Sequence, residues 1–565
     1  MPQQVRGCEL ARRPRAIRPA RQQWRPSMSD GDNLTWNLAD VWETVAGQLP
    51  EAPAQIHGER SFTWAEFDAR ANGIASALAT EATADDRVAL YLRNCPEYLE
   101  ATHAALKLGI PSVNTNYRYG GEELLYLWND ADITSVVFHG SFTEAADRLR
   151  PQAGKIRQWL HVDDGTAPCP EWAVPYEQAA AQGTSQAVRS SWGRHGSDLF
   201  LLYTGGTTGL PKGVMWRSID FLRQTNEVGS LKYPLEQGVD GIRAMLTVPG
   251  RTHISASPLM HGNGLFGALI TMHQGGLNVS LTAPGFDAAE FLDTIDRHRV
   301  TSVAIAGEVF GKRILRAFDA APGRWNIQGV KDVLNSAALL SEPTKRGLLE
   351  HWPEATIMDG FSSSEGFGLG WSLATKDNIP ATGRFNPGAN VRVFDDDDAL
   401  VAAGSGVIGR LAVSGRVPLG YYKDKAKSDA TFVEIGGERY SMPGDRGIVN
   451  DDGTIQLIGR ESLCINSGGE KIFTEEVEAV IVDLTGVSDA LVVGLPDAEW
   501  GQIVTAVVSL EPGAERSESE IIDGVKARLA GYKAPRRVRI VDDVPRGPNG
   551  KADYDRARQL AAGTE

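Results

Sequence analysis

A loop of glycine and threonine that directly follows an apolar run is the segment best suited to bind phosphate. Residues 199–203 (LFLLY) predict a buried strand. The strand leads into three threonines and three glycines, which are Thr204, Gly205, Gly206, Thr207, Thr208 and Gly209. Backbone N–H groups and hydroxyls of such a loop can surround phosphate oxygens, and Lys212 adds a positive charge. Since Gly213 stands where a Walker A loop needs Ser or Thr, the segment predicts a triphosphate loop of another class.

This string resembles the phosphate loop of the adenylate-forming superfamily, which includes acyl-CoA synthetases, peptide-synthetase adenylation domains and luciferases. Further motifs of that family follow in its order, from about residue 60 to residue 551. Their wording is most similar to actinobacterial fatty-acid and steroid side-chain CoA ligases, as in YTGGTTGLPKGVMWR, INSGGEKIFTEEVEA and GYKAPR. The resemblance implies ATP, Mg²⁺ and coenzyme A as cofactors.

A serine-rich turn, DGFSSSEG, is similar to the family's Tyr-Gly-x-Thr-Glu segment. The resemblance places the ring of Phe361 against adenine and the Ser364 hydroxyl on the α-phosphate. It makes Glu365 the ligand of Mg²⁺, a hard cation that takes oxygen ligands and bridges phosphates. Asp359 and Gly360 open the turn and belong to the same predicted nucleotide site. Taken alone, this string would predict a polar turn with an exposed glutamate.

The same resemblance adds two segments to the nucleotide site. Asp445 would accept hydrogen bonds from both ribose hydroxyls, which suits the two oxygens of a carboxylate. Arg460 could bind ribose or phosphate. The small residues Ser336, Ala337 and Ala338 align with a Gly-Gly-Ala-Pro-Leu-type segment that packs against adenine. Because serine and alanine replace the glycines, the backbone could follow a slightly different course there.

Four residues form the predicted catalytic set: Thr204, His261, Glu365 and Lys551. His261 follows Pro-Leu-Met, as in the family's Pro-x-x-His-x-x-Gly segment, where the histidine lines the passage between nucleotide and acyl pockets. Lys551 follows a turn, Pro-Arg-Gly-Pro-Asn-Gly, and matches the family's catalytic lysine. Outside this context, a histidine beside glycine is more often structural, and a lysine near a terminus usually serves solubility.

The segment INSGGEKI resembles the loop that lines the pantetheine tunnel in acyl-CoA synthetases. Glycine leaves room there, so Gly468, Gly469 and Lys471 join the predicted cofactor-binding residues. Ser462 stands where the family usually has the Asp or Lys of an interdomain hinge. Because Lys551 and this loop serve different steps from one small domain, we expect that domain to rotate between them.

The elements that must position these residues alternate between strand and helix. Residues 87–92, 133–138 and 300–306 predict strands, and residues 97–107 predict a helix. Such alternation implies layered α/β sheets with helices outside. Residues 390–415 show short alternating strands around an acidic turn, which predicts a small β subdomain.

A second unit follows, with predicted helices at 475–484 and 519–530 and strands at 490–495, 503–510 and 537–541. The fold class is therefore α/β: a large N-terminal adenylate-forming domain of layered sheets plus a β subdomain, with a small mobile α+β C-terminal domain. We place the ATP- and acyl-binding domain at residues 28–458 and the mobile domain at residues 459–565. A disordered basic leader is expected at residues 1–27, which hold seven arginines against one acid and lack the apolar segment of a secretory signal. A transit peptide is the alternative for this leader.

Composition excludes several other classes. A chain of 565 residues is too long for one core, and its net charge of −15 argues against a nucleic-acid partner. No apolar run is long enough to span a bilayer, although transient contact with a membrane surface and a homodimer stay open. The four cysteines show no metal-ligand spacing and indicate a reduced, cytoplasmic protein.

The resemblance implies an AMP-forming acyl-CoA synthetase. Its substrate would be a long-chain fatty acid or a steroid side-chain acid, activated as acyl-AMP and transferred to CoA. An adenylating enzyme that loads a carrier protein in trans is the alternative. A non-enzymatic nucleotide-binding protein with a decayed site is disfavoured, because the charged residues of the motifs are intact: Lys212, Glu365, Asp445, Arg460 and Lys551.

Overall fold

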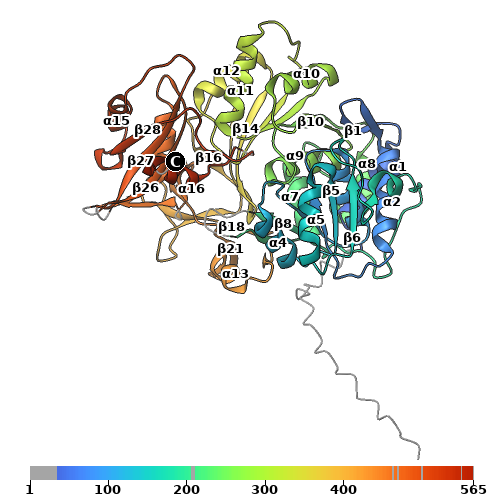
Figure 1. The fold of residues 1–565 in the computed structure, drawn as a ribbon. Coiled ribbons are helices and arrows are strands. Elements are labelled where there is room, and N and C mark those ends of the chain that lie inside the picture. The colour runs from blue at the N-terminus through green and yellow to red at the C-terminus, as the bar shows by residue number, and fades with distance from the viewer. Residues whose placement is uncertain are drawn as a thin grey trace, which may run out of the picture.

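The structure is a computed structural model that describes residues 35–204, 210–460, 463–467, 470–497, 500–548 and 550–563. Within these ranges the strands form three sheets, and sixteen α-helices accompany them (Figure 1). Two sheets belong to the large N-terminal part, and the third belongs to the small C-terminal part. None of these helices combines the length and the apolar character that crossing a membrane requires.

The first sheet has eight strands in the order β19-β9-β8-β4-β3-β5-β6-β7. Its strands are β3 (Val88–Tyr91), β4 (Ser112–Asn114), β5 (Ser135–His139), β6 (Gln158–Val162), β7 (Val174–Pro175), β8 (Leu199–Thr204), β9 (Lys212–Arg217) and β19 (Gly420–Tyr421). From β8 to β7 all neighbours are parallel, whereas β9 and β19 are added antiparallel. Every residue of β3 and β5 is buried, as expected for parallel strands covered on both faces.

The second sheet has fifteen strands, in the order β2-β1-β11-β10-β12-β13-β14-β15-β16-β23-β22-β18-β21-β20, with β17 beside β18. Its strands are β1 (Pro53–His57), β2 (Arg60–Thr63), β10 (Thr252–Ser255), β11 (Leu277–Ser280), β12 (Ser302–Ile305), β13 (Asp332–Asn335), β14 (Thr356–Ser363), β15 (Gly366–Ala374), β16 (Arg384–Pro387), β17 (Val391–Phe394), β18 (Gly409–Ser414), β20 (Phe432–Ile435), β21 (Glu438–Ser441), β22 (Asp445–Val449) and β23 (Ile455–Arg460). Strands β1 and β10–β14 pair in parallel, and pairing is antiparallel from β15 onward. The antiparallel end contains the predicted β subdomain.

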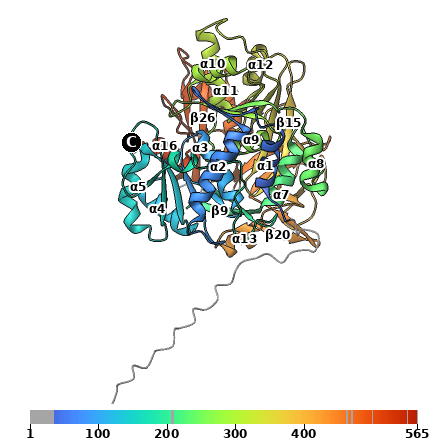
Figure 2. The same ribbon diagram turned by 90° about the vertical axis from the view of Figure 1, so that its right-hand side faces the viewer.

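The helices of the large domain are α1 (Leu38–Gln48), α2 (Trp64–Ala79), α3 (Pro96–Lys107), α4 (Gly121–Asp130), α5 (Thr143–Leu149), α6 (Tyr176–Ala180), α7 (Ser218–Val228), α8 (Gly238–Met245), α9 (Gly262–His273), α10 (Ala288–His298), α11 (Gly307–Ala320), α12 (Glu342–His351) and α13 (Lys425–Thr431). Figure 2 shows α1, α2, α3 and α9 close together near the centre of the large domain. One core cluster joins these helices to strands of both sheets. Helix α9 packs closely on β10, because a Cβ at Gly267 would lie 2.7 Å from the His253 ring.

The small domain is a five-stranded sheet between helices. Its strands are β24 (Ile465–Ser467), β25 (Glu470–Ile472), β26 (Val487–Asp497), β27 (Gly501–Leu510) and β28 (Arg537–Ile540), and its helices are α14 (Thr474–Val482), α15 (Glu518–Lys526) and α16 (Tyr554–Ala562). Alternate residues of β26 face opposite sides: Val492 packs with α14 and α15, whereas Leu491 and Val493 pack with α16. Apolar side chains on both faces of a strand follow from this two-sided cover.

The predicted fold class is confirmed, since both domains have the expected mixed sheets. Helix α15 is shorter than expected and ends at Lys526 instead of residue 530. Gly531 and Pro535 disfavour helix beyond this point, and the chain turns toward β28. The predicted domain boundary at residue 458 falls inside β23, which pairs with the large sheet as far as Arg460. The predicted leader lies outside the described residues.

Candidate active site

Glu365 lies in the tight turn that joins β14 to β15. Ser363 pairs with Gly366, so Ser364 and Glu365 are the two residues of this hairpin turn. The indole N–H of Trp216 on β9 donates to the Ser364 carbonyl at 3.0 Å. The hydroxyl of Tyr421 donates to Glu365 Oε1 at 2.7 Å. The turn of the larger sheet is therefore fixed to the antiparallel edge of the eight-stranded sheet.

Thr204 and Lys212 mark the two ends of the predicted phosphate loop. They are paired residues at the end of β8 and the start of β9. The loop residues between them, Gly205, Gly206, Thr207, Thr208 and Gly209, lie outside the described residues. The ammonium group of Lys212 forms an ion pair with the carboxylate of Asp424. This hydrogen bond, together with the N–H of Lys427, lowers the pKa of Asp424.

Asp445 and Arg460 face each other across the antiparallel pair β22–β23. Arg460 Nε donates to Asp445 Oδ1 at 3.0 Å, and the negative charge of Asp445 raises the pKa of Arg460. Asp445 is 3% exposed, and its second oxygen, Oδ2, has no hydrogen-bond partner in the described part of the chain. A buried carboxylate oxygen without a donor is costly, so this atom fits a hydroxyl donor from a ligand.

The predicted adenine segment follows β13. Ala337 has a φ of +72°, in the left-handed region that glycine adopts without strain. The backbone therefore takes a glycine-like conformation although alanine replaces glycine. The side chain of Asn335 supports the segment, since it donates to the Ala338 carbonyl at 3.0 Å and accepts from the Gly307 N–H at 2.6 Å. Ser336 lies between these contacts and is partly buried.

Asp359 on β14 is buried beside two polar partners that the sequence analysis did not identify. Asn335 donates to Asp359 Oδ1 at 2.5 Å, and Lys345 of α12 lies 2.5 Å from Oδ2. Burial raises the pKa of Asp359, and Lys345 opposes this change. Gly360 follows, and the ring of the next residue, Phe361, lies 5.6 Å from the ring of Phe385. Asn335 adjoins the small-residue segment and could have been suspected, whereas no local signal points to Lys345.

His261 is buried directly before α9 and carries no positive charge at neutral pH. Burial lowers its pKa to about 3, and the charges of Lys551 and Arg118 act in the same direction. Its Nε2 atom has no hydrogen-bond partner among the described residues. A neutral imidazole at this place can line a passage and exchange hydrogen bonds with a ligand.

The small domain brings Lys551 to the large domain. Gly550 has a φ of +73°, and a Cβ there would lie 2.7 Å from the Ala306 carbonyl oxygen and 3.2 Å from the Phe310 ring. Only glycine fits this close approach at the start of α11. The turn is closed by the Gly547 N–H, which donates to the Lys551 carbonyl at 2.7 Å.

The Lys551 ammonium lies within electrostatic range of residues from the large domain. Surrounding protein lowers its pKa first and the charge of Arg460 lowers it further, while Glu365 raises it. Its side chain nevertheless reaches solvent, so it lies in an open cleft lined by protein. His261 is also close enough to feel this charge. The structure thus brings Lys551, Glu365, Arg460 and His261 together from two domains.

Polar contacts between helix α11 and the small domain accompany this packing. We call this set the α11 interface: Lys312, Arg316, Val487, Ser488 and Glu511. Lys312 Nζ donates to the carbonyl oxygens of Val487 and Ser488, each at 2.9 Å. Arg316 donates to the Ser488 hydroxyl at 2.7 Å and pairs with Glu511 at 3.1 Å. The Arg316 and Glu511 side chains are 44% and 34% exposed, so water competes with the contacts at this rim.

Three predicted residues of the CoA loop are not placed in the site. Gly468 and Gly469 lie outside the described residues, and Lys471 belongs to the edge strand β25. In the described ranges, no cluster of three or more His, Cys, Asp or Glu residues could hold a metal ion. A single carboxylate such as Glu365 nevertheless fits Mg²⁺, which is usually held by one or two carboxylates together with phosphate oxygens.

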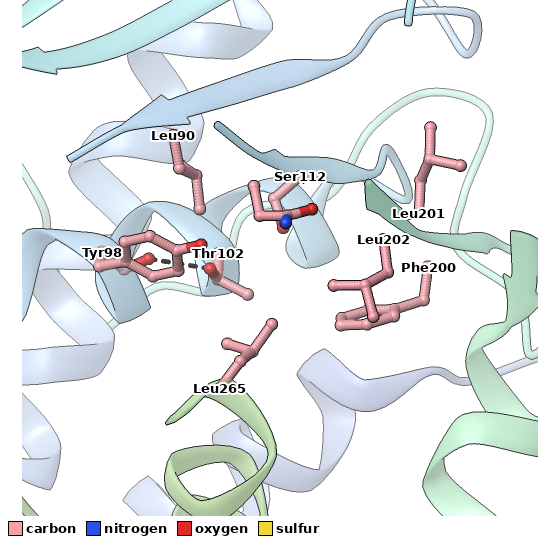
Figure 3. A pocket seen from close by; sticks show the side chains of 9 residues that line it. Leu90, Tyr98, Thr102, Ser112, Phe200, Leu201, Leu202 and Leu265 are labelled. Atoms are coloured by element: carbon pink, nitrogen blue, oxygen red, sulfur yellow. Dashed lines mark hydrogen bonds between the residues drawn. The ribbon is translucent and has the colours of Figure 1, made fainter. Parts of the chain in front are cut away.

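A small cavity in the large domain lies apart from these residues (Figure 3). It has a volume of about 10 Å³ and is lined by residues of α3, α9 and the eight-stranded sheet, among them Leu90, Tyr98, Leu202 and Leu265. This volume is close to the minimum for one water molecule. The cavity is therefore too small for an organic acid, and it contains none of the predicted site residues.

The sequence matches one enzyme family along most of its length. Residues 42–422 match the AMP-binding enzymes, and residues 476–551 match the C-terminal domain of AMP-binding enzymes. The 3-oxocholest-4-en-26-oate–CoA ligase of Rhodococcus rhodochrous is 35% identical over 534 residues, which cover 92% of this chain and 95% of that enzyme. The medium-chain acyl-CoA ligase Mig of Mycobacterium avium is 35% identical over 554 residues, with 94% and 100% covered.

Solved structures agree with the fold. The anthranilate CoA ligase AuaEII in complex with anthranoyl-AMP superposes with a TM-score of 0.80 at 21% identity, covering 94% of this chain and 98% of that one. ATP-bound MatB from Rhodopseudomonas palustris gives a TM-score of 0.74 at 25% identity, covering 93% and 98%. Sequence, architecture and the placement of the motif residues agree, and the chain belongs to the AMP-binding enzyme family.

Proposed function

We propose that this protein is an ATP-dependent acyl-CoA synthetase that converts a carboxylic acid to its CoA thioester. The reaction proceeds through acyl-AMP and releases AMP and pyrophosphate. The acid is a long-chain fatty acid or a steroid side-chain acid, because the relatives at 35% identity are named as ligases of such acids. ATP and CoA are cytoplasmic metabolites, so we place the enzyme in the cytoplasm.

Activation is needed because a carboxylate is a poor electrophile. In the first step the acid's carboxylate oxygen attacks the α-phosphorus of ATP, and pyrophosphate leaves. In the second step the CoA thiolate attacks the acyl carbon, and AMP leaves. The first step brings an anion against a polyanion, so its main barrier is electrostatic.

We assign roles in the first step to residues that carry suitable charges. Bound Mg²⁺ would neutralise phosphate charge, and the Glu365 carboxylate would hold it. Lys212 and Lys551 would stabilise the charge that develops on the transferring and leaving groups. Asp445 would accept hydrogen bonds from ribose through its unpaired oxygen. The neutral ring of His261 would line the entry of the acid.

One observation carries this proposal. Lys551 of the small domain lies close enough to Glu365 of the large domain for the two charges to interact. This arrangement suits the first step, in which both groups would act on one triphosphate. The second step needs the Gly468–Gly469 loop at the same place, so we propose that the small domain rotates after acyl-AMP forms. The domain division at residues 458 and 459 belongs to this proposal.

The test is a panel of acids assayed for two products. Pyrophosphate release from ATP should depend on a suitable acid and on Mg²⁺, and thioester should form when CoA is added. Acid-dependent pyrophosphate release without transfer to CoA would favour an enzyme that loads a carrier protein in trans. Nucleotide binding without acid-dependent turnover across fatty and steroid acids would contradict the proposed activity.

A further inference from the structure

An edge strand of the eight-stranded sheet passes directly beside the candidate site. Strand β19 (Gly420–Tyr421) runs antiparallel to β9, which begins with Lys212. The next residue, Tyr422, donates its N–H to the Gly213 carbonyl at 2.7 Å. Lys423 then adopts a left-handed φ of 58°, and the chain turns into α13. The strand therefore presents its side chains next to the predicted phosphate loop.

Two consecutive tyrosines of this segment make the same kind of bond to different carboxylates. The Tyr421 hydroxyl donates to Glu365 Oε1 at 2.7 Å. The Tyr422 hydroxyl donates to Asp132 Oδ2, also at 2.7 Å, and its ring lies 4.7 Å from the Arg87 guanidinium. Asp132 lies directly after α4 and belongs to none of the motifs. The chain thus contains a matched pair of tyrosines, and one of them contacts the candidate site.

Tyr421 is built to remain a donor. Its side chain is buried, with 6% of the residue exposed, and its ring packs against Phe432 at 5.9 Å. Burial and the negative charge of Glu365 raise its pKa, so the phenol keeps its proton at neutral pH. A phenol that donates to a carboxylate makes a charge-assisted bond, which is stronger than a neutral one.

The position of Glu365 explains why such a donor would matter. A glutamate in a two-residue turn has three side-chain torsions, and a carboxylate that binds a cation must be fixed in one geometry. Trp216 holds the backbone of the turn at Ser364, and Tyr421 holds one oxygen of the side chain. With Oε1 engaged, Oε2 can turn toward a cation.

We propose that Tyr421 is a positioning residue for the magnesium–ATP site and acts through Glu365. This inference rests on the proposed function, because that proposal assigns Mg²⁺ to Glu365. Tyr421 itself would touch neither nucleotide nor metal. Its effect would be to pre-order the carboxylate, which lowers the Mg²⁺ concentration that the enzyme needs.

The experiment compares Tyr421→Phe with Tyr422→Phe, since each removes one hydroxyl bond to a carboxylate and keeps the ring. Thermal stabilisation by a fixed concentration of ATP is measured while Mg²⁺ is titrated, which reports binding without turnover. Loss of a residue that orients a metal ligand typically costs about tenfold or more in metal affinity. We expect Tyr421→Phe to need about tenfold more Mg²⁺ and Tyr422→Phe to behave as wild type.

Two further measurements separate positioning from general damage. Conversion of supplied acyl-AMP and CoA to thioester should stay near the wild-type rate in both variants. In a Glu365→Gln background, adding Tyr421→Phe should cause no further loss of Mg²⁺-dependent stabilisation, because the two residues act as one unit. If the Phe variant of Tyr421 is too unstable to assay, Tyr421→His in the same comparison replaces it.

The outcomes distinguish this inference from the proposed function. Equal Mg²⁺ requirements in the two single variants, or an additive loss in the double variant, would overturn the role of Tyr421. Absence of acid-dependent pyrophosphate release in the wild type would overturn the proposed activity. Because the stabilisation assay needs no acid, it tests Tyr421 even in that case.

Discussion

The large-domain and small-domain sides of the candidate site are held in different ways. On the large-domain side, Tyr421 and Trp216 fix the turn of Glu365, and Asp445 faces Arg460 across a strand pair. These contacts lie within the large sheets or between them. They persist for as long as the domain is folded, so this half of the site is pre-organised.

The small-domain side is joined to the site by contacts that cross a domain interface. Lys551 depends on the fit of Gly550 against Ala306 and on the partly exposed α11 interface (Figure 1). Such contacts can be exchanged for water without unfolding either domain. The difference suggests a division of labour: the large domain holds the nucleotide, and the small domain decides which step can occur.

Replacing Lys551 should break this comparison most strongly. Lys551→Ala removes a compact positive charge from the step in which two anions meet, and losing one such group typically costs about 10²–10³ in rate. The same variant should convert supplied acyl-AMP and CoA to thioester at a near-normal rate, because rotation would carry Lys551 away. Single-turnover measurements of both half-reactions check this prediction.

The control for Lys551→Ala is its melting temperature. The side chain reaches solvent, and substitutions at such positions usually change stability by less than about 0.5 kcal/mol. An equal loss in both half-reactions at an unchanged melting temperature would contradict both the role and the rotation.

Asp445 tests the pre-organised side. Asp445→Asn keeps the shape of the side chain but removes the charge that would accept ribose hydroxyls, and hydrogen bonds to charged groups contribute about 1.5–3 kcal/mol. We therefore expect ATP affinity, measured by calorimetry, to fall at least about tenfold. Thioester formation from supplied acyl-AMP should also suffer, since the adenylate carries the same ribose.

This double loss would distinguish Asp445 from Lys551. Because Asp445 is buried against Arg460, some loss of stability is expected, and ligand-free melting temperatures must be compared. ATP affinity equal to that of wild type would show that the unpaired oxygen of Asp445 serves no nucleotide.

The pH dependence of the first half-reaction would sharpen the comparison. The pKa of Lys551 is lowered by surrounding protein and by the charge of Arg460, so its ammonium is lost at a lower pH than the ordinary 10.5. Adenylation should therefore decline on the alkaline side below that value, while transfer from supplied acyl-AMP should show no such limb. Lys551→Arg should move the decline to higher pH, because a guanidinium keeps its charge.

Much of this arrangement could be predicted from sequence because it is local. Apolar runs and helical periodicity identified strands and helices such as β8 and α14, and the motif strings identified Glu365 and Lys551. The departure from glycine at Ala337 did not alter the backbone conformation, since that residue still has a positive φ.

The supporting contacts could not be predicted in this way. Tyr421 and Glu365 are 56 positions apart, and Lys312 and Val487 are 175 positions apart. No spacing rule within one element connects such pairs, because sheet order and domain packing bring them together. Sequence thus identified the groups that carry charge, and tertiary structure identified what holds them.

The α11 interface should give the smallest effect, and the most specific one. Lys312→Ala and Arg316→Ala each remove contacts across the domain boundary and leave the motif residues intact. Partly exposed ion pairs contribute about 0.2–1 kcal/mol, so the arrangement seen here should lose about twofold to fivefold in population. Adenylation should slow by that factor, and transfer from supplied acyl-AMP should be unchanged or slightly faster.

Arg313 provides the matched control, since it lies on the same helix and is exposed. Arg313→Ala changes the charge of α11 by the same amount, so an equal effect would indicate long-range electrostatics rather than contact. Raising the salt concentration should slow adenylation in the wild type and have little further effect in Arg316→Ala, because the screened pair is already absent. If the interface variants slowed both half-reactions equally, the contacts would serve the fold of the small domain. A loss confined to adenylation would instead show that weak, exchangeable contacts on α11 set the balance between the two steps.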